Sequence, residues 1–213
     1  MTHNERYAAV DHLIYAAPDL EQGIRDMERL LGHRAVLGGH HPDFGTRNAL
    51  LGLGPDTYIE IIAPDPGLTS PPRGRLFGLD RLERPRLVTW VLRDEAIEAR
   101  AAAARGAGLA LGAVAQGSRV RPDGAVVSWK VTDPYAMPLD GAVPFLIAWG
   151  TTPHPAASLP AAGQLHDLRV EHPEPEAVRA AFRVLGVGLG VAQSACLQLI
   201  ATIRVDGREV EIR

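Results

Sequence analysis

The sequence has almost no cysteine and almost no lysine. Cys196 is the only cysteine in 213 residues, which excludes an intramolecular disulfide and a cysteine-rich zinc site. We expect its thiol to be buried and inert, because it lies in an apolar stretch. Lys130 is the only lysine among 22 basic residues, and the net charge of −3 gives no electrostatic reason to expect nucleic-acid binding.

Long apolar runs are also missing. No stretch of about 18 apolar residues occurs, so we expect no transmembrane helix and no membrane partner. Residues 1–6 contain no apolar segment of the kind found in signal peptides, so we expect a cytoplasmic protein. Aromatic residues make up only 5% of the chain, so its core must consist mainly of Leu, Val, Ile and Ala.

The sequence does contain a repeated order of strand, helix and further strands, which predicts an α+β fold of βαβββ modules. In the first block, Asp19 is a typical N-cap and Gly32 a typical end of a helix with an apolar stripe. The predicted parts are a module at 8–66, a module at 85–150, a shorter third module at 164–213, and linkers at 67–84 and 151–163.

The first and third blocks share two polar positions. His12 precedes Gly32 by 20 residues, and His166 precedes Gly186 by the same number (32 − 12 and 186 − 166). Each block also ends in a strand with a central glutamate between apolar residues, Glu60 in the first and Glu211 in the third. The middle block has the same order of elements but lacks both polar residues.

His12 and Glu60 are the best candidates for chemistry. Side chains alternate along a strand, so Leu13 and Tyr15 would face the helix and His12 the opposite side. Imidazole and carboxylate together are common ligands of divalent metals, and a carboxylate in so apolar a strand is costly to bury alone. The alternative is structural: His12 is a hydrogen-bonded core histidine and Glu60 pairs with an arginine.

Four segments carry a resemblance to a known family. Residues 10–20 (VDHLIYAAPDL) resemble the opening of glyoxalase-like domains in the vicinal-oxygen-chelate superfamily. The later segments that resemble one subgroup, in the same order, are 38–49 (GGHHPDFGTRNA), 57–63 (TYIEIIA) and 144–149 (PFLIAW) with His154-Pro155. The resemblance covers residues 8–155 and extends only loosely to the third block.

The resemblance implies a cupped, mixed β-sheet made from paired modules, with helices on its outer face. It implies a divalent metal (Zn, Mn, Fe, Ni or Mg) in the cup, held by a His or Gln from each first strand and a Glu from each fourth strand. His12 and Glu60 match one such half-site, and Glu60 is also the catalytic candidate. The metal would chelate vicinal oxygens of the substrate as a Lewis acid.

The second module departs from that pattern. Its first strand, 87–91, offers no ligand, and Ala148 stands where relatives are expected to carry glutamate. Three alternatives remain open. The third block could supply Glu211 with Asp167 or His166, His41 could serve from a loop, or the protein binds no metal and has no cofactor.

Other residues are candidates for ligand contacts. The His40-His41-Pro42 segment is predicted to be an irregular loop that bends at Gly45, and such loops often carry function. Tyr58 shares a strand face with Glu60. The predicted ligand-binding residues are His41, Asn48, Tyr58 and Trp149.

Two functions fit these observations. The first is a divalent-metal-dependent lyase, isomerase or dioxygenase acting on a small oxygen-rich molecule. The second is a metal-free protein that binds a small molecule in the same cup, for sequestration or regulation; a module whose site has decayed is a third reading. Because three modules leave one unpaired, a homodimer is one way to cover the exposed sheet edge.

Overall fold

The computed structural model of this chain describes residues 9–213. The expected absence of a signal peptide concerns residues 1–6, which lie outside the described residues. Residue 8, the first residue of the predicted first module, also lies outside them. No helix in the described part of the chain is long and apolar enough to span a membrane.

The first block folds as a strand, a helix and three strands. The Asp19 side chain accepts a hydrogen bond from the backbone N–H of Gln22 (3.0 Å) and so caps the helix. Gly32 ends it in the left-handed conformation, with φ 78°. The elements are β1 (Val10–Ala16), α2 (Leu20–Leu31), β2 (Val36–His41), β3 (Thr46–Gly52) and β4 (Tyr58–Pro64).

The second block repeats this order after a connection that holds a short 3-10 helix, η2 (Leu76–Arg81). Helix α3 begins at Ile97, after a turn in which the Asp94 side chain accepts a hydrogen bond from the Ala96 backbone N–H (2.8 Å). The elements are β5 (Arg86–Arg93), α3 (Ile97–Gly106), β6 (Val114–Val120), β7 (Val126–Thr132) and β8 (Phe145–Ala148).

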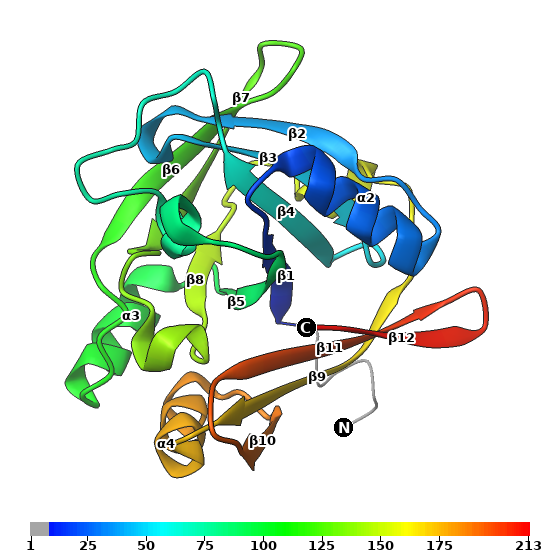
Figure 1. Cartoon of the computed structure of the whole chain (residues 1–213). Helices are drawn as coiled ribbons and strands as arrows, with labels where there is room; N and C mark the ends of the chain where they lie inside the picture. The colour runs from blue at the N-terminus through cyan, green and yellow to red at the C-terminus, as the bar shows by residue number, and fades with distance from the viewer. Residues whose placement is uncertain (1–8) are drawn as a thin grey trace.

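The eight strands of these two blocks close into a barrel (Figure 1), in the order β1-β4-β3-β2-β6-β7-β8-β5. This confirms the predicted α+β class with a cupped sheet of βαβββ modules. The two halves join where β1 runs antiparallel to β5, and where His40 of β2 pairs with Val120 of β6. Closure pairs the edges of both halves, so the barrel has no free edge strand.

Alternation along β1 separates the inside of the barrel from the outside. Leu13 and Tyr15 pack in the outer core with the apolar stripe of α2, whereas Ile14 and Ala16 belong to a cluster inside the barrel. Figure 1 shows α2 and α3 on the outer face of the barrel. The helices therefore leave the interior of the barrel to the inward-facing side chains of its strands.

The third block forms a separate four-stranded sheet below the barrel (Figure 1). Its elements are β9 (Gln164–His172), α4 (Pro175–Leu185), β10 (Gly190–Gln193), β11 (Gln198–Val205) and β12 (Arg208–Ile212). Strand β10 is short and was not expected from the sequence. Phe182 of α4 meets Trp90 of β5 edge to face, with ring centroids 5.9 Å apart, so this sheet and the barrel share one core.

The strand order of this sheet differs from that of the first two blocks. It is β10-β9-β11-β12, so β11 separates the first strand of the block from the last. In the first block, β1 and β4 are direct parallel neighbours. The third block therefore repeats the order of elements but not the arrangement that brings His12 beside Glu60.

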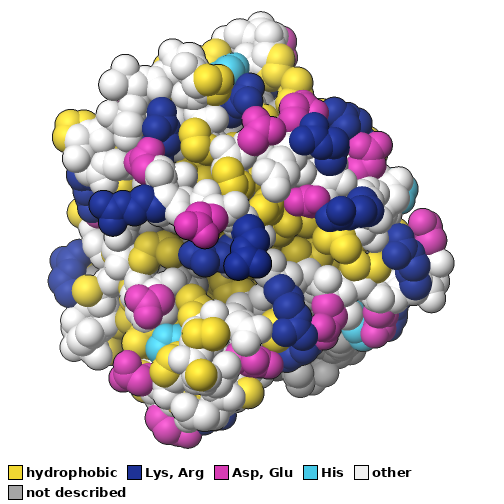
Figure 2. All heavy atoms as spheres, viewed as in Figure 1, with side chains coloured by type: hydrophobic (Ala, Val, Ile, Leu, Met, Phe, Trp, Pro, Cys, Tyr) yellow, Lys and Arg dark blue, Asp and Glu magenta, His cyan; other side chains and the backbone are white. Residues whose placement is uncertain are grey.

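The surface differs from expectation at one residue. Cys196 is exposed, because it lies in the turn between β10 and β11 and not in the core, so the expectation of a buried thiol is wrong. On the face seen in Figure 2, Lys and Arg side chains lie among Asp and Glu side chains, as the small net charge indicates.

Candidate functional site

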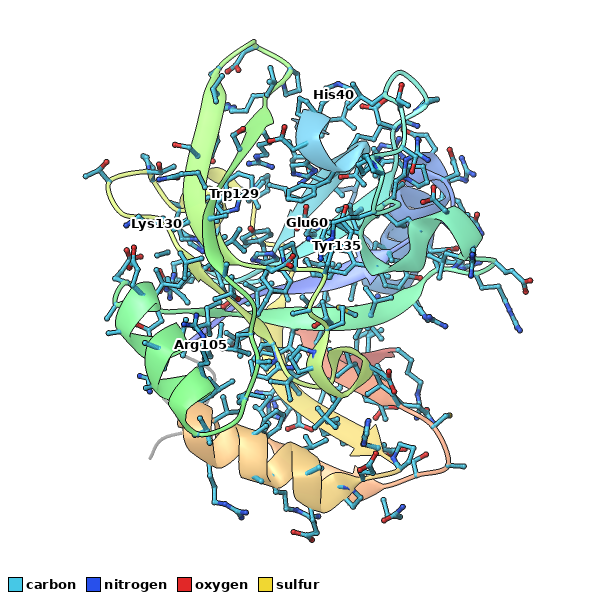
Figure 3. All side chains as sticks on the ribbon, turned by 90° about the vertical axis from the view of Figure 1, so that its left-hand side faces the viewer. His40, Glu60, Arg105, Trp129, Lys130 and Tyr135 are labelled. Atoms are coloured by element: carbon cyan, nitrogen blue, oxygen red, sulfur yellow. The ribbon has the colours of Figure 1, made fainter. Side chains whose placement is uncertain are left out.

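A narrow pocket, with a cavity volume of about 60 Å³, opens into the barrel interior. Its polar lining consists of His12, His41, Asn48, Tyr58, Glu60 and Arg119. Its aromatic lining consists of Phe44, Phe77, Trp129, Phe145 and Trp149. The structure thus gathers six of the predicted site residues here; Figure 3 labels Glu60 and Trp129 among the side chains of the barrel.

His12 and Glu60 meet at the base of this pocket. Strands β1 and β4 are parallel neighbours in which Ile14 pairs with Glu60, so His12 and Glu60 project from the same side of the sheet. His12 Nε2 lies 3.3 Å from Glu60 Oε2, and both side chains are buried. The alternative in which Glu60 pairs with an arginine is therefore not the arrangement found.

Asp11 holds the other side of the His12 ring. Its Oδ1 lies 2.6 Å from His12 Nδ1, and its Oδ2 accepts a hydrogen bond from Trp149 Nε1 (2.9 Å) and lies 3.1 Å from His154 Nε2. Simple alternation would place Asp11 on the helix side. The pairing of β1 with β5 shifts register between Val10 and His12, and such a bulge re-aims a side chain. Sequence periodicity carries no signal of this shift.

The charges of this cluster stabilise one another. Burial alone would lower the pKa of His12, but its hydrogen bonds to Asp11 and Glu60 outweigh burial and raise the pKa to about 8. Burial would raise the pKa of Glu60, but the His12 hydrogen bond and nearby positive charge lower it to about 2. The pKa of Asp11 is also lowered, because its hydrogen bonds to His12 and His154 outweigh burial. In the metal-free protein His12 is therefore an imidazolium between two carboxylates at neutral pH.

Asn48 and His41 approach Glu60 from the neighbouring strands. Asn48 Nδ2 donates to Glu60 Oε1 at 2.6 Å, and His41 Nε2 lies 3.9 Å from the same oxygen. His41 Nδ1 lies 3.0 Å from Thr46 Oγ1. Burial lowers the pKa of His41 to about 4, so its ring is neutral near pH 7.

The segment that carries His41 is more regular than predicted. His40 and His41 are the last residues of β2, and only Pro42–Phe44 form a short 3-10 turn before Gly45. Gly45 bends the chain with φ 62°, as expected. His41 therefore reaches the pocket from a strand of the barrel wall and not from a loop.

Aromatic rings form much of the pocket wall. Tyr58 stacks on His12, with ring centroids 4.5 Å apart and planes at 15°. Trp149 lies at a 56° tilt to Trp129, with ring centroids 5.6 Å apart. Trp129 was not expected at the site from the sequence, because it alternates with exposed residues in a hairpin and its inward direction depends on barrel closure.

The second block contributes apolar groups where the family resemblance implies a second pair of ligands. The inward-facing residues of β8 are Phe145 and Ile147, which line the pocket. Ala148 packs in the outer core instead, so the expectation that it stands at a ligand position is wrong. The second half-site is absent because Ile147 and Phe145, not Ala148, face the pocket.

The third block does not supply the missing ligands either. Asp167 and Glu211 lie on the separate sheet, both opposite Thr202, and neither lines the pocket. Glu211 forms an exposed ion pair with Arg169 (2.8 Å). The alternative in which Asp167 and Glu211 complete the site is therefore not the arrangement found, because β11 separates their strands and the sheet lies outside the barrel.

The donor set of the pocket fits one half of a metal site. Within residues 9–213, no group of three or more His, Cys, Asp or Glu side chains is arranged to hold a metal by itself. His12 Nε2 and Glu60 converge, and His41 Nε2 is the next donor along the wall. Because metal-bound histidines commonly donate their other ring N–H to a carboxylate, the Asp11–His12 contact also suits a metal ligand.

Comparison with solved structures places the fold among known proteins. A hypothetical protein from Staphylococcus aureus superposes with a TM-score of 0.61 at 14% identity, over 95% of this chain and 83% of that chain. Methylmalonyl-CoA epimerase from Mycobacterium tuberculosis is 21% identical with a TM-score of 0.40, over 66% of this chain and 85% of that one. A methylmalonyl-CoA epimerase in complex with methylmalonyl-CoA and NH4+ is 16% identical with a TM-score of 0.45, over 70% of this chain and 99% of that one.

Sequence comparison identifies the family. No curated protein matches the chain. The family model described as a glyoxalase-like domain matches residues 10–186, which span the whole barrel and the first part of the third block. This chain therefore belongs to the glyoxalase-like domain family.

Proposed function

We propose that this protein is a divalent-metal-dependent lyase or isomerase that acts on a small oxygen-rich molecule in the barrel pocket. The observation that supports this proposal is the convergence of His12 Nε2 and Glu60 Oε2 at 3.3 Å on the pocket wall. Imidazole and carboxylate are the ligands that Zn, Mn, Fe and Ni sites share, and Mg sites use the carboxylate. His12 and Glu60 would hold the metal, with His41 as the adjacent donor.

The metal would polarise an oxygen of the substrate as a Lewis acid. The chain's own residues supply the rest. Asp11 holds His12 in one orientation through Nδ1. Glu60 would hold the metal through Oε2, and its Oε1, positioned by Asn48, could accept a proton from a carbon next to the polarised oxygen. The aromatic side chains of the lining make the surroundings of that proton transfer less polar.

A lyase or isomerase needs fewer of these groups than a dioxygenase. Metal-dependent oxygenases of the two-histidine type hold the metal with two imidazoles and one carboxylate. Here the second imidazole, that of His41, stands 3.9 Å from Glu60 and is hydrogen-bonded to Thr46. Proton transfer needs only a positioned carboxylate, and Glu60 already has one oxygen held by Asn48.

A second candidate is a metal-free binding protein that uses the same pocket. The apolar face of the second block, with Phe145, Ile147 and Trp129, favours this function. His12 and Glu60 also satisfy each other as an ion pair, which lowers the cost of burying both without a metal.

Metal analysis of the purified protein separates the two candidates. We would load the chain with Mn, Fe, Ni, Zn or Mg, remove free metal, and measure bound metal in wild type, His12→Ala and Glu60→Gln. The controls are His33→Ala and Glu83→Gln, which change residues outside the pocket. About one metal per chain, lost only in the pocket variants, supports the enzyme. Stoichiometric binding that survives both pocket variants, or no binding in wild type, would refute it.

We also propose that two copies associate through the third sheet. The barrel has no free edge, so the outer strands β10 and β12 are the edges that remain among the described residues. Light scattering coupled to size-exclusion chromatography gives the mass directly. A mass of one chain at all concentrations contradicts this assembly, and a Pro substitution of Val210 in β12 should shift a dimer toward monomer.

A further inference from the structure

Arg119 is a buried cation without a carboxylate. It lies on β6, lines the barrel pocket, and is only 7% exposed. Its Nη1 donates a 3.4 Å hydrogen bond to Asn48 Oδ1, and its buried Nε has no hydrogen-bond partner. Within residues 9–213, no carboxylate lies within ion-pair distance of it. A guanidinium remains charged at any working pH, so this charge is desolvated without an adjacent counterion.

Arg75, which has a structural role, looks different. Arg75 donates from Nε to Gly45 O (2.7 Å), from Nη2 to Leu68 O (3.0 Å) and from Nη1 to Asp80 Oδ1 (2.7 Å). All of its guanidinium nitrogens have partners although it is less buried than Arg119. An arginine placed only to hold the fold would therefore be expected to be satisfied within the chain.

Nearby groups leave the donors of Arg119 free for a ligand. Asn48 is the bridge between the two charges of the pocket, because its Nδ2 donates to Glu60 and its Oδ1 accepts from Arg119. Glu60 is thereby occupied by Asn48 and His12 and does not pair with Arg119 directly. The remaining N–H groups of Arg119 are available on the side that lines the pocket.

Two glycines leave space for the side chains of Arg119, Asn48 and Trp129. A Cβ at Gly38 would lie 2.1 Å from Asn48 Oδ1 and 2.6 Å from Arg119 Nη1, so any larger residue would push the pair apart. Gly117 leaves space for the Trp129 ring in the pocket wall, because a Cβ at this position would lie 2.4 Å from Trp129 Nε1. Two glycines on adjacent strands thus let a cation and an indole ring line the same pocket.

We infer that Arg119 is the anion subsite of the pocket and that the ligand carries a carboxylate on an apolar or aromatic body. This inference rests on the proposed function, since it names the substrate class of the same pocket. A planar carboxylate matches the fork of a guanidinium and would supply the missing counterion. The body of the ligand would contact Trp129, Trp149 and Phe145, which line the same pocket.

A matched pair of ligands tests the inference. We would titrate 2-naphthoate and its neutral isostere 2-naphthamide by calorimetry into wild type, Arg119→Gln and Arg119→Lys. The control is Arg121→Gln, which removes an exposed arginine two residues along the chain that does not line the pocket. Circular dichroism and thermal melting of each variant establish that it is folded.

We expect wild type and Arg121→Gln to bind the acid at least about tenfold more tightly than the amide, the ratio typical of a charge-assisted contact. Arg119→Gln should lose this preference but still bind the amide, and Arg119→Lys should keep part of it. If Arg119→Gln does not fold, Gly38→Ala serves instead, since it should displace Arg119 and reduce the preference.

Three results would overturn the inference. Equal binding of acid and amide to wild type removes the anion subsite and leaves the metal-dependent function standing. A preference for the acid that survives in Arg119→Gln assigns it to another group. No binding of either compound rejects the substrate class, and the metal analysis then decides separately whether the proposed function stands.

Discussion

Asp11 and His12 are adjacent in the sequence, yet their side chains meet inside the barrel, with Oδ1 of Asp11 2.6 Å from Nδ1 of His12. Two neighbours in a regular strand would face opposite sides. The register shift between β1 and β5 turns Asp11 toward His12, and it also brings Asp11 to Trp149 and His154. The ring of His12 is thereby held with Nε2 facing Glu60.

Replacing Asp11 with Asn should weaken metal binding by about 10–100-fold, the usual effect of losing a partner that orients a metal-bound histidine. The variant keeps the shape of the side chain but loses the charge that holds the His12 ring. A metal titration of the folded variant measures the effect. Asp123→Asn, at the exposed tip of the β6–β7 hairpin, is the control. Unchanged affinity in Asp11→Asn would show that this contact does not position His12 for a metal.

Gly38→Ala should destabilise the protein by about 1–3 kcal/mol, because overpacking a buried site forces its neighbours to move. The new Cβ would lie 2.1 Å from Asn48 Oδ1, and Asn48 also holds Glu60. Urea denaturation measures the loss. Gly106→Ala is the matched control, since a Cβ there meets nothing within 4 Å, and it should be neutral or slightly stabilising. Equal behaviour of the two variants would contradict the close approach.

The metal-free protein, prepared with a chelator, should lose stability on the acid side through His41. Burial lowers the pKa of His41 from 6.5 to about 4. The unfolded chain takes up this proton near pH 6.5 and the folded chain only near pH 4, so the free energy of unfolding falls by about 3 kcal/mol over that interval. In His41→Gln this share of the acid loss should disappear, and His33→Gln should retain it.

The pKa shift of His12 has the opposite sign to that of His41, so its effect on stability has the opposite pH dependence. Its pKa is raised from 6.5 to about 8, so its contribution is complete below pH 6.5 and is lost as the pH rises through 8. Urea denaturation of wild type, His12→Gln, His41→Gln and His33→Gln between pH 4 and 9 checks both directions by difference. If the free energy of unfolding falls between pH 6.5 and 4 by the same amount in His41→Gln as in wild type, His41 is not buried in its neutral form.

Phe182→Ala should destabilise the chain by about 3–5 kcal/mol, the usual cost of removing a buried aromatic ring. The ring is 2% exposed and meets Trp90 of the barrel at 5.9 Å. Because the third sheet and the barrel share this core, denaturation followed by the tryptophans and by circular dichroism should remain a single transition. Arg183→Ala, exposed on the same helix, should change stability by less than about 0.5 kcal/mol. Two separate transitions in wild type would contradict a shared core.

Local signals in the sequence predicted many of the elements closely. Asp19 and Gly32 bound helix α2, because an N-cap side chain and a left-handed glycine act within one turn of the chain. Alternation along two neighbouring strands also placed His12 and Glu60 on one side, and the structure brings them together.

Strand order and closure were decided only by the tertiary structure. The repeat of His12 and Glu60 by His166 and Glu211 is visible in the sequence, but in the third sheet β11 lies between the corresponding strands. Pairing between distant strands depends on contacts far apart along the chain, which hydrophobic periodicity does not encode. For the same reason, nothing local indicated that Asp11 leaves its alternating side, or that Arg119 of the second block faces Asn48 of the first.

The sequence alone therefore determined the family and the order of elements in the modules. It also indicated the His12–Glu60 pair, because the alternation of side chains along each strand is a local property. Only the closed barrel decided what surrounds that pair. Closure brings the apolar wall of the second block and Arg119 into the pocket that contains Glu60, and the proposed choice of ligand rests on these two features.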